Sequence, residues 1–132
     1  MNRNSVFSCG KKLAIVEDEE IVSMMLENVL QNVGYSVVTF SSGEELLGGM
    51  ADFSPDLILM DIGLDGALDG IQTADTILSE YGVPVVFLTG HSDDEIMQSI
   101  IRLSPDGCLT KPFREKELFS IIEVALSRHR TE

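Results

Sequence analysis

Two hydrophobic patterns alternate along the chain. Short, continuous apolar runs are typical of strands buried on both faces of a parallel sheet, and longer segments carry apolar residues at helical spacing. The runs predict strands at residues 13–16, 36–40, 57–60, 83–88 and 108–109. The longer segments predict helices at residues 19–33, 42–50, 69–81, 92–103 and 114–128. This order predicts an α/β fold, a (βα)5 doubly wound parallel sheet with helices on both faces.

Local signals mark several helix ends. Ser42 with Glu45, and Ser92 with Glu95, form the capping-box pattern that begins a helix. Gly82 is placed to end the helix at residues 69–81, because glycine adopts left-handed backbone angles at little cost. The strand at residues 36–40 is expected to be more peripheral in the sheet than the others.

The length predicts a single domain, because 132 residues is an ordinary size for one hydrophobic core. Residues 1–11 are polar and are expected to form a flexible N-terminal tail. Residues 12–130 are expected to form the domain. The chain shows no internal repeat, linker or low-complexity segment.

The chain is strongly acidic. It has 9 Lys and Arg against 22 Asp and Glu, a net charge of −13, and no Lys or Arg between Lys12 and Arg102. Such a surface repels phosphate backbones and anionic headgroups, so direct binding to nucleic acid or a membrane is not expected. No apolar run reaches the ~20 residues of a membrane span, and no signal peptide is recognisable. Cys9 and Cys108 make no disulfide framework, so we expect free thiols and a cytoplasmic location.

Polar residues collect where the predicted strands end. Glu17 and Asp18 follow the first strand, Asp61 the third, Thr89 the fourth and Lys111 the fifth. In a doubly wound sheet, ligands bind at the carboxyl ends of strands, near the point where strand order reverses. With the strand order 2-1-3-4-5, the first and third strands flank that point and the three carboxylates are expected to converge. A hard divalent cation would relieve their repulsion, so the cluster is a sensible Mg²⁺ site.

The acidic residues after the first strand have an alternative role. Negative charges are favourable at a helix N-terminus, and this role accounts for Glu19 and Glu20 as well as a functional one does. Glu17 and Asp18 are assigned to the cation site because they share one edge of the sheet with Asp61.

Four motifs in order resemble those of the response-regulator receiver domain of two-component signalling. They lie at residues 13–19, 57–61, 85–90 and 109–113, each at the end of a predicted strand. Each motif is weak alone, but four in this order are highly specific. The resemblance covers residues 12–130 and implies a flavodoxin-like strand order, 2-1-3-4-5.

The resemblance implies a phosphoacceptor switch. Asp61 matches the residue that accepts a phosphoryl group from a phosphohistidine of a sensor histidine kinase or phosphotransfer domain. Thr89 matches the hydroxyl that bonds the phosphoryl oxygen, and Lys111 matches the lysine that pairs first with the aspartate and then with the phosphoryl group. A metal-oriented carboxylate is a reasonable nucleophile, because the transfer needs mainly charge neutralisation and alignment. On this interpretation the chain catalyses only its own phosphorylation and dephosphorylation.

The resemblance also implies a Mg²⁺ site and a cis proline. Glu17 and Asp18 match the acidic pair that holds the ion directly or through water, and Asp61 shares in its coordination. The backbone carbonyl of Gly63 matches a further ligand. Pro112 matches a proline that follows a cis peptide bond.

Some positions depart from the family pattern. Cys108 stands where the family usually has an aromatic residue, so coupling through ring rotation must be altered or absent. We expect Cys108 to be a small buried hydrophobic residue rather than a redox sensor. The loop at residues 63–70 is one residue longer than usual, lacks proline and has three glycines, which predicts flexibility. His91, at the mouth of the site, either tunes water access or is an exposed neighbour of the helix cap.

Other functions compete with the switch. A phosphorylation-independent, receiver-like binding module is the main alternative, because of Cys108 and the altered loop. An aspartyl-phosphate phosphatase usually has a general-acid aspartate two residues after its nucleophile, but that position is Gly63. Flavin binding is disfavoured, because no Ser/Thr/Gly-rich phosphate loop follows the first strand.

A homodimer is a further expectation from the resemblance. Receivers often dimerise through the fourth helix, the fifth strand and the fifth helix, here predicted at residues 92–103, 108–109 and 114–128. Arg102, Arg114 and Lys116 lie near that face, where they could pair with acidic residues of a second copy.

Overall fold

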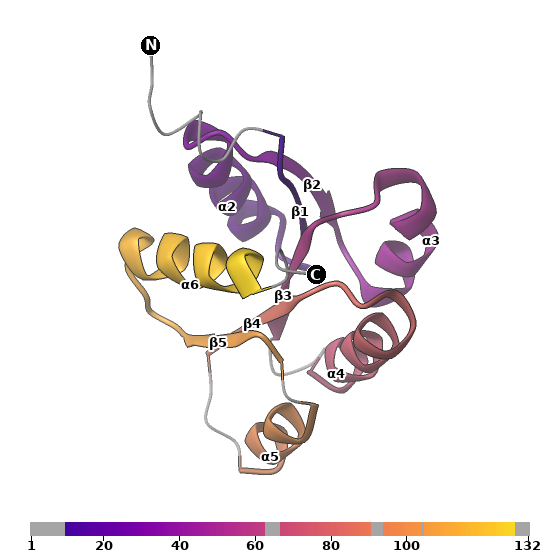
Figure 1. Ribbon diagram of the computed structural model, residues 1–132. Coiled ribbons are helices and arrows are strands. Elements are labelled where there is room, and N and C mark those ends of the chain that lie inside the picture. Colours follow the sequence, from indigo (N-terminus) through magenta and orange to yellow (C-terminus); the bar gives the residue numbers. More distant parts are fainter. Residues whose placement is uncertain (1–9, 63–66, 91–93, 104, 129–132) are drawn as a thin grey trace.

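Strands and helices alternate throughout the computed structural model, which describes residues 10–62, 67–90, 94–103 and 105–128 (Figure 1). The elements are β1 (Lys12–Val16), α2 (Glu20–Asn32), β2 (Ser36–Phe40), α3 (Gly43–Phe53), β3 (Leu57–Ile62), α4 (Ala67–Thr76), η1 (Ile77–Tyr81), β4 (Val85–Thr89), α5 (Asp94–Leu103), β5 (Gly107–Thr110) and α6 (Glu115–Arg128). Every predicted strand and helix is therefore present. The proposed tail at residues 1–11 falls largely outside the described residues.

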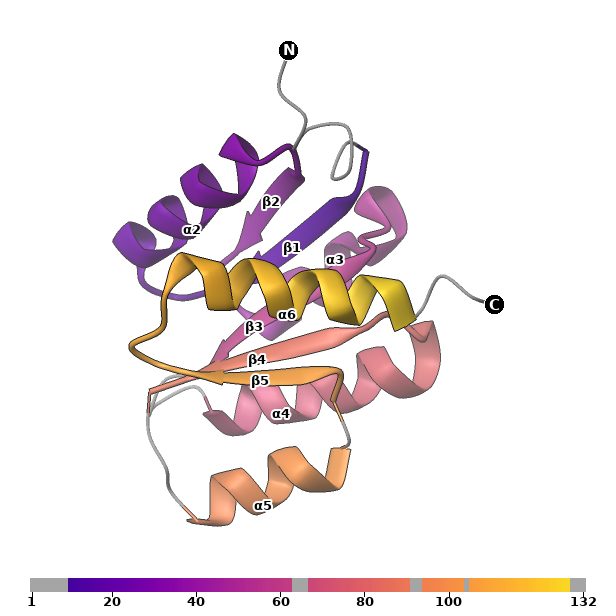
Figure 2. The same ribbon diagram turned by 60° about the vertical axis from the view of Figure 1, so that its left-hand side comes forward.

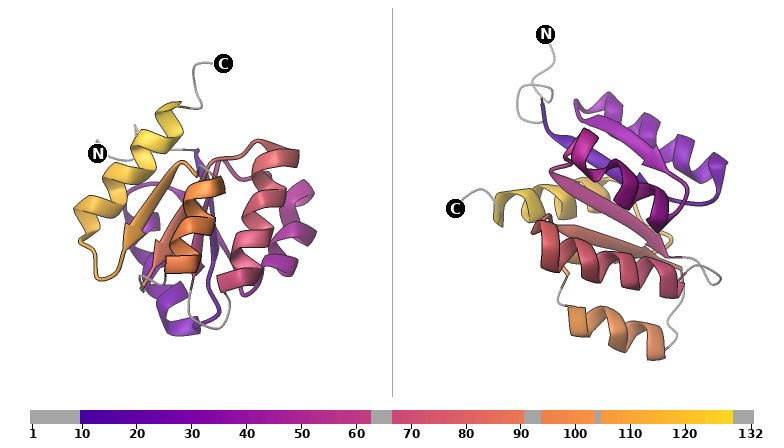
Figure 3. Two further views of the ribbon diagram at one scale, coloured as in Figure 1. Left: turned by 90° about the horizontal axis from the view of Figure 1, so that it is seen from below. Right: turned by 90° about the vertical axis from the view of Figure 1, so that its right-hand side faces the viewer.

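The strands form one 5-stranded sheet in the order β2-β1-β3-β4-β5, as predicted. All the neighbouring pairs are parallel. Helices α2 and α6 cover one face of the sheet, and α3, α4 and α5 cover the other (Figures 2 and 3). The fold is therefore a doubly wound α/β sheet, with β2 at one edge and β5 at the other.

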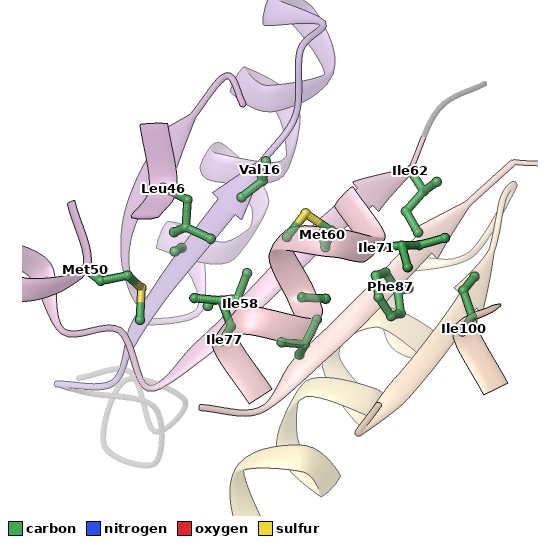
Figure 4. Packing of buried hydrophobic residues seen from close by; sticks show 13 residues of the cluster. Val16, Leu46, Met50, Ile58, Met60, Ile62, Ile71, Ile77, Phe87 and Ile100 are labelled. Carbon is green, nitrogen blue, oxygen red and sulfur yellow. The ribbon is translucent and has the colours of Figure 1, made fainter. Parts of the chain in front are cut away.

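The continuous apolar runs supply buried side chains to both faces of the sheet, because successive side chains of a strand point to opposite sides. In β1, Leu13 and Ile15 pack with α2 and α6, whereas Ala14 and Val16 pack with the helices of the opposite face. Figure 4 shows this second cluster, in which Leu46 of α3 and other helical residues meet the strands. Burial on both faces explains why these strands do not alternate polar and apolar residues.

Helix α3 begins as the sequence predicts. Ser42 is its N-cap, and the Ser42 Oγ accepts a 3.1 Å hydrogen bond from the Glu45 amide. The Glu45 carboxylate reaches back one residue further than a standard capping box, accepting a 2.6 Å bond from the Ser41 amide. The helix continues to Phe53, past the predicted end at Met50. The second predicted capping serine, Ser92, lies outside the described residues.

The helix predicted at residues 69–81 begins at Ala67 and changes character before it ends. Its last segment, η1, is π-helical, and the Gly82 amide donates a 3.0 Å bond to the carbonyl of Ile77, five residues earlier. Gly82 has a φ of 66°, the left-handed conformation that glycine adopts without steric cost. The predicted glycine stop is confirmed, and Ile77 at the start of the wider turn is fully buried.

Among the residues that the structure describes, no helix combines the length and the apolar character needed to cross a lipid bilayer.

Candidate functional site

An ion pair joins β3 to the segment after β5. The Lys111 Nζ lies 2.6 Å from Asp61 Oδ1, and the side chains are 33% and 3% exposed, respectively. Asp61 is an interior residue of β3, aligned with Leu88 of β4. The Lys111 amide donates a 2.8 Å bond to the Thr89 carbonyl, which extends the β4–β5 ladder and holds the lysine at this edge. The Lys111–Pro112 peptide bond is cis, as the resemblance implied.

Glu17 brings a second buried carboxylate to the same place. It follows β1 directly, and its amide donates a 3.0 Å bond to the Phe40 carbonyl of β2. The side chain is only 6% exposed. Its Oε2 accepts a 2.7 Å bond from the backbone amide of Glu19. β1 and β3 are neighbours in the sheet, so the predicted convergence is confirmed for Glu17 and Asp61.

The two carboxylates leave one oxygen each without a donor. Glu17 Oε1 and Asp61 Oδ2 are buried and have no hydrogen-bond partner. Burial raises the pKa of Glu17 from 4.5 to about 8. Asp61 reinforces the shift, because it can accept a hydrogen bond from the protonated Glu17 carboxyl and its negative charge repels the deprotonated form. The Glu19 amide and the charge of Lys111 oppose the shift. Without another cation, the site therefore favours a proton on Glu17.

The oxygen pair fits a small, hard cation. Mg²⁺ is commonly held by one or two carboxylates, with water and a phosphate filling its other positions. Glu17 and Asp61 supply two buried oxygens that lack donors, and acidic oxygen is the ligand type that Mg²⁺ prefers. Within the described parts of the chain, no group of three or more His, Cys, Asp or Glu side chains is arranged to hold a metal. The fit therefore rests on two carboxylates rather than three.

Asp18 is exposed, on the turn between β1 and α2, unlike the buried Glu17 beside it. Its place in the Mg²⁺ site stays a prediction. Gly63, whose carbonyl was predicted to be a further ligand, and His91 both lie outside the described residues. Pro112 is exposed beside Lys111.

Thr89 ends β4 at the predicted edge of the sheet. It is 2% exposed and aligned with Ile62, the residue that follows Asp61 in β3. On its other side it is aligned with Thr110, next to Lys111. The sheet register therefore places Thr89 between β3, which carries Asp61, and β5, which Lys111 follows.

Cys108 is half-buried in β5, where it is aligned with Phe87. It packs against the core that lies between the sheet and helices α3, α4 and α5. Burial raises the pKa of its thiol, which lowers the fraction of reactive thiolate. These surroundings fit the expected small hydrophobic residue.

The Glu19 amide is a site component that the sequence did not reveal. Its bond to Glu17 comes from the backbone, so no residue type signals it. The Glu19 side chain is exposed and makes no capping bond to α2.

The family model for the response regulator receiver domain matches residues 13–123. The chain belongs to the response regulator receiver family. It is a signalling domain of the kind that accepts phosphoryl groups from histidine kinases.

Solved receiver structures are similar over nearly the whole chain. The signal receiver domain of a modulated diguanylate cyclase from Desulfovibrio desulfuricans G20 is 36% identical, with a TM-score of 0.81 over 89% of this chain and 94% of that one. The N-terminal domain of a response regulator/sensory box/GGDEF 3-domain protein from Carboxydothermus hydrogenoformans is 37% identical, with a TM-score of 0.80 over 90% and 96%.

A histidine-kinase receiver has a similar structure. The signal receiver domain of a signal transduction histidine kinase from Syntrophus aciditrophicus is 26% identical, with a TM-score of 0.81 over 93% of this chain and 96% of that chain. Receivers similar to this chain thus occur in regulators and in kinases.

Proposed function

We propose that Asp61 is the phosphoacceptor of this receiver and that the reaction depends on Mg²⁺. The observation that carries the proposal is the buried Asp61 carboxylate, with Lys111 on one oxygen and the other oxygen left without a donor beside Glu17. In the transfer, a carboxylate oxygen of Asp61 forms a bond to phosphorus while the bond from phosphorus to the donor's imidazole nitrogen breaks. The product is an acyl phosphate on this chain and a free histidine on the kinase or phosphotransfer domain.

Lys111 and Thr89 are proposed to stabilise the transferred group. The ammonium already neutralises Asp61 at 2.6 Å, and its flexible stem allows it to follow the negative charge onto the phosphoryl oxygens. Thr89 is proposed to donate its hydroxyl hydrogen to a phosphoryl oxygen, because the register holds it at the same edge. Phosphorylation would thereby alter the ends of β4 and β5 and switch the adjoining surface.

Glu17, Asp18 and Asp61, together with the backbone carbonyl of Gly63, are proposed as the residues that would hold Mg²⁺, directly or through water. A bound Mg²⁺ would supply the positive charge that phosphoryl transfer requires. Glu17 offers a buried oxygen with no donor, which supports its place in this set.

The test is covalent labelling of the wild-type chain. Acetyl phosphate with Mg²⁺ is expected to add one phosphoryl group, measured by intact-protein mass spectrometry, and chelation of Mg²⁺ should slow the addition by at least about 100-fold. The adduct should also disappear with time after the donor is removed, through self-catalysed hydrolysis. A chain that binds Mg²⁺ but gains no phosphoryl group from any of several small donors would contradict the proposal.

The phosphorylation-independent binding module is not favoured. A binding module of this kind gives no reason to bury two carboxylates with a single ammonium. Burying such a cluster costs folding free energy, and a phosphoacceptor site is a reason to retain it. The half-buried, unpaired thiol of Cys108 also fits the proposed cytoplasmic location.

We also propose homodimerisation through α5, β5 and α6, the elements that correspond to the face predicted from the sequence. Arg102 on α5 and Lys116 on α6 are exposed, and so is Arg114, the residue before α6. Two large apolar residues are exposed there as well, Ile101 at 68% and Val124 at 52%. Cations beside apolar residues suit contact with the acidic surface of a second copy.

Beryllium fluoride mimics the phosphoryl group when Mg²⁺ is present. Its addition is expected to raise the sedimentation coefficient of the chain from that of a monomer to that of a dimer. Ile101→Gln should weaken this dimer about tenfold, because the substitution replaces an apolar contact with a polar amide that dimerisation would bury. Ile21→Gln is the matched control, because Ile21 is similarly exposed at 74% but lies on α2. An unchanged monomer, or equal weakening by both substitutions, would rule out this face.

A further inference from the structure

A phenylalanine ring lies where a side chain at Gly49 would project. Phe40 is the last residue of β2, and Gly49 lies in α3, the helix that follows β2. A Cβ atom on Gly49 would come within 2.8 Å of Phe40 Cε1 and 3.0 Å of Phe40 Cζ. Non-bonded carbon atoms pack best at about 3.5–4.0 Å, so one of the two groups would have to move. The absence of a side chain at Gly49 therefore makes room for the ring.

The strand end that carries this ring also holds the backbone of the site. The Phe40 carbonyl accepts a 3.0 Å bond from the Glu17 amide, one residue beyond the alignment of Val16 with Phe40. This bond fixes the chain where it leaves β1 and enters the turn that carries Glu17 and Asp18. The Glu17 side chain is buried, so a shift of its backbone would disturb close-packed neighbours. The position of the Phe40 carbonyl therefore bears on the site.

The connection from β2 to α3 is held in place at several points. At the start of α3, the Glu45 carboxylate accepts a 2.6 Å bond from the Ser41 amide, and Ser42 Oγ accepts a 3.1 Å bond from the Glu45 amide. The Phe40 ring also packs against the core between the sheet and helices α3, α4 and α5. Because close-packed groups transmit strain, a group added at Gly49 is expected to push on the end of β2.

We propose that Gly49 is a positioning residue for the Mg²⁺ site, which acts through the ring and the carbonyl of Phe40 on the backbone of Glu17. This inference rests on the proposed Mg²⁺-dependent function, and it holds whether Glu17 or Asp18 contacts the ion directly. Gly49 lies in α3 and touches neither the ion nor the phosphoryl group. By leaving room for the ring, it allows β2 to end where its last carbonyl meets the Glu17 amide. The turn after β1 is thereby kept beside the end of β3, which carries Asp61.

Two neighbouring glycines of α3 provide a matched pair of substitutions. Gly49→Ala adds a methyl group against the Phe40 ring, whereas Gly48→Ala adds the same group to the same helix with nothing within 4 Å. Both variants exchange glycine for the best helix former, so both gain the same helical propensity. Phe40→Leu removes the two ring atoms nearest to the added methyl group, Cε1 and Cζ, and is combined with Gly49→Ala as the rescue variant. Circular dichroism and thermal unfolding define conditions in which every variant is fully folded.

Mg²⁺ affinity, measured by nuclear magnetic resonance titration of the backbone amides, is expected to be about fivefold weaker in Gly49→Ala than in Gly48→Ala. In the double variant, Phe40→Leu should restore the affinity to within about twofold of that of Phe40→Leu alone, because the methyl group then has no ring to displace. Equal affinities in the two glycine variants would overturn the inference, since the ring would have turned aside without moving the strand. A loss that Phe40→Leu does not rescue would overturn it as well. A wild-type chain that binds no Mg²⁺ would instead overturn the proposed function, and the inference with it.

Hydrogen exchange of the Glu17 amide tests the backbone step without Mg²⁺. This amide should exchange at least about fivefold faster in Gly49→Ala than in Gly48→Ala, because its bond to the Phe40 carbonyl is weakened. The Ile58 amide, which bonds to the Pro84 carbonyl near the start of β3, is the internal reference for global stability. A Glu17 amide that exchanges no faster relative to Ile58 would overturn the inference while leaving the proposed Mg²⁺ site intact.

Discussion

Replacing Asp61 with Asn is expected to abolish the phosphoryl adduct that acetyl phosphate and Mg²⁺ form on the wild-type chain. An acyl phosphate needs a carboxylate oxygen as the nucleophile, and the side-chain amide of Asn supplies none. The substitution keeps the size of the side chain and leaves an oxygen that can still accept the bond from Lys111. The fold should therefore survive, and the loss should be chemical. Intact-protein mass spectrometry measures the adduct, with a fall below detection as the expected result.

Asp52→Asn is the matched control for this substitution. Asp52 lies exposed on α3, away from the ends of β3 and β5. It should label at the wild-type rate, because the change removes one negative charge without touching the site. Full labelling of Asp61→Asn would show that another residue accepts the phosphoryl group, and the proposal for Asp61 would then be wrong.

The fold was predictable because its strands are continuous apolar runs. β1, β3 and β4 are nearly pure apolar runs, and every residue in them is buried except the exposed Lys12 and the half-buried Asp61. A chain that buries both faces of such strands needs a helix layer on each side, which fixes the architecture. β2 is less buried and is one of the two edge strands, in agreement with the peripheral position predicted for it.

Strand ends were harder to predict, because polar residues break the apolar pattern. The predicted third strand stops at Met60, but β3 continues through Asp61 and Ile62. The hydrophobic pattern does not predict a carboxylate inside a strand. Asp61 can lie there because Lys111 pairs with it in place of water. β4 likewise extends to the buried Thr89, beyond its predicted end at Leu88.

Helix details depended on packing that the sequence does not display. Helix α3 continues past its predicted end at Met50, because Leu46 and Met50 pack into the core and sustain the helix to Phe53. The π-helical turn at the end of α4 has no distinguishing residue pattern. It is seen only from the bond between the Gly82 amide and the Ile77 carbonyl.

The site was predictable in its charges but not in its anchoring. Parallel strands bring their carboxyl ends to one edge, so the meeting of Glu17, Asp61 and Lys111 follows from topology. The exposure of Asp18 follows from the turn into α2, where consecutive side chains point in different directions. The Glu19 amide could not be predicted, because every residue except proline carries one.

Without Mg²⁺, the wild-type chain is expected to lose stability as the pH rises from about 4.5 to about 8. The pKa of Glu17 is about 8 in the folded chain and 4.5 in its ordinary state, mainly because the carboxyl group is buried. Between these values the folded chain holds a proton that the unfolded chain has released. Raising the pH therefore favours unfolding, with a slope that approaches about 1.4 kcal/mol per pH unit from this group. The free energy of unfolding, measured with urea at a series of pH values in a chelating buffer, gives this slope.

Glu17→Gln isolates this contribution from the other titrating groups. The Gln side chain is neutral at every pH and its oxygen can still accept the bond from the Glu19 amide, so the variant resembles the protonated wild-type chain. Its stability should exceed that of the wild-type chain near pH 8 without Mg²⁺, and the two should converge near pH 4.5. Saturating Mg²⁺ should reverse the order near pH 8, because it stabilises only a folded chain that can bind it. Parallel pH profiles for the two chains would show that folding does not raise the pKa of Glu17. If the wild-type chain stays less stable than Glu17→Gln near pH 8 in saturating Mg²⁺, Glu17 is not part of the cation site.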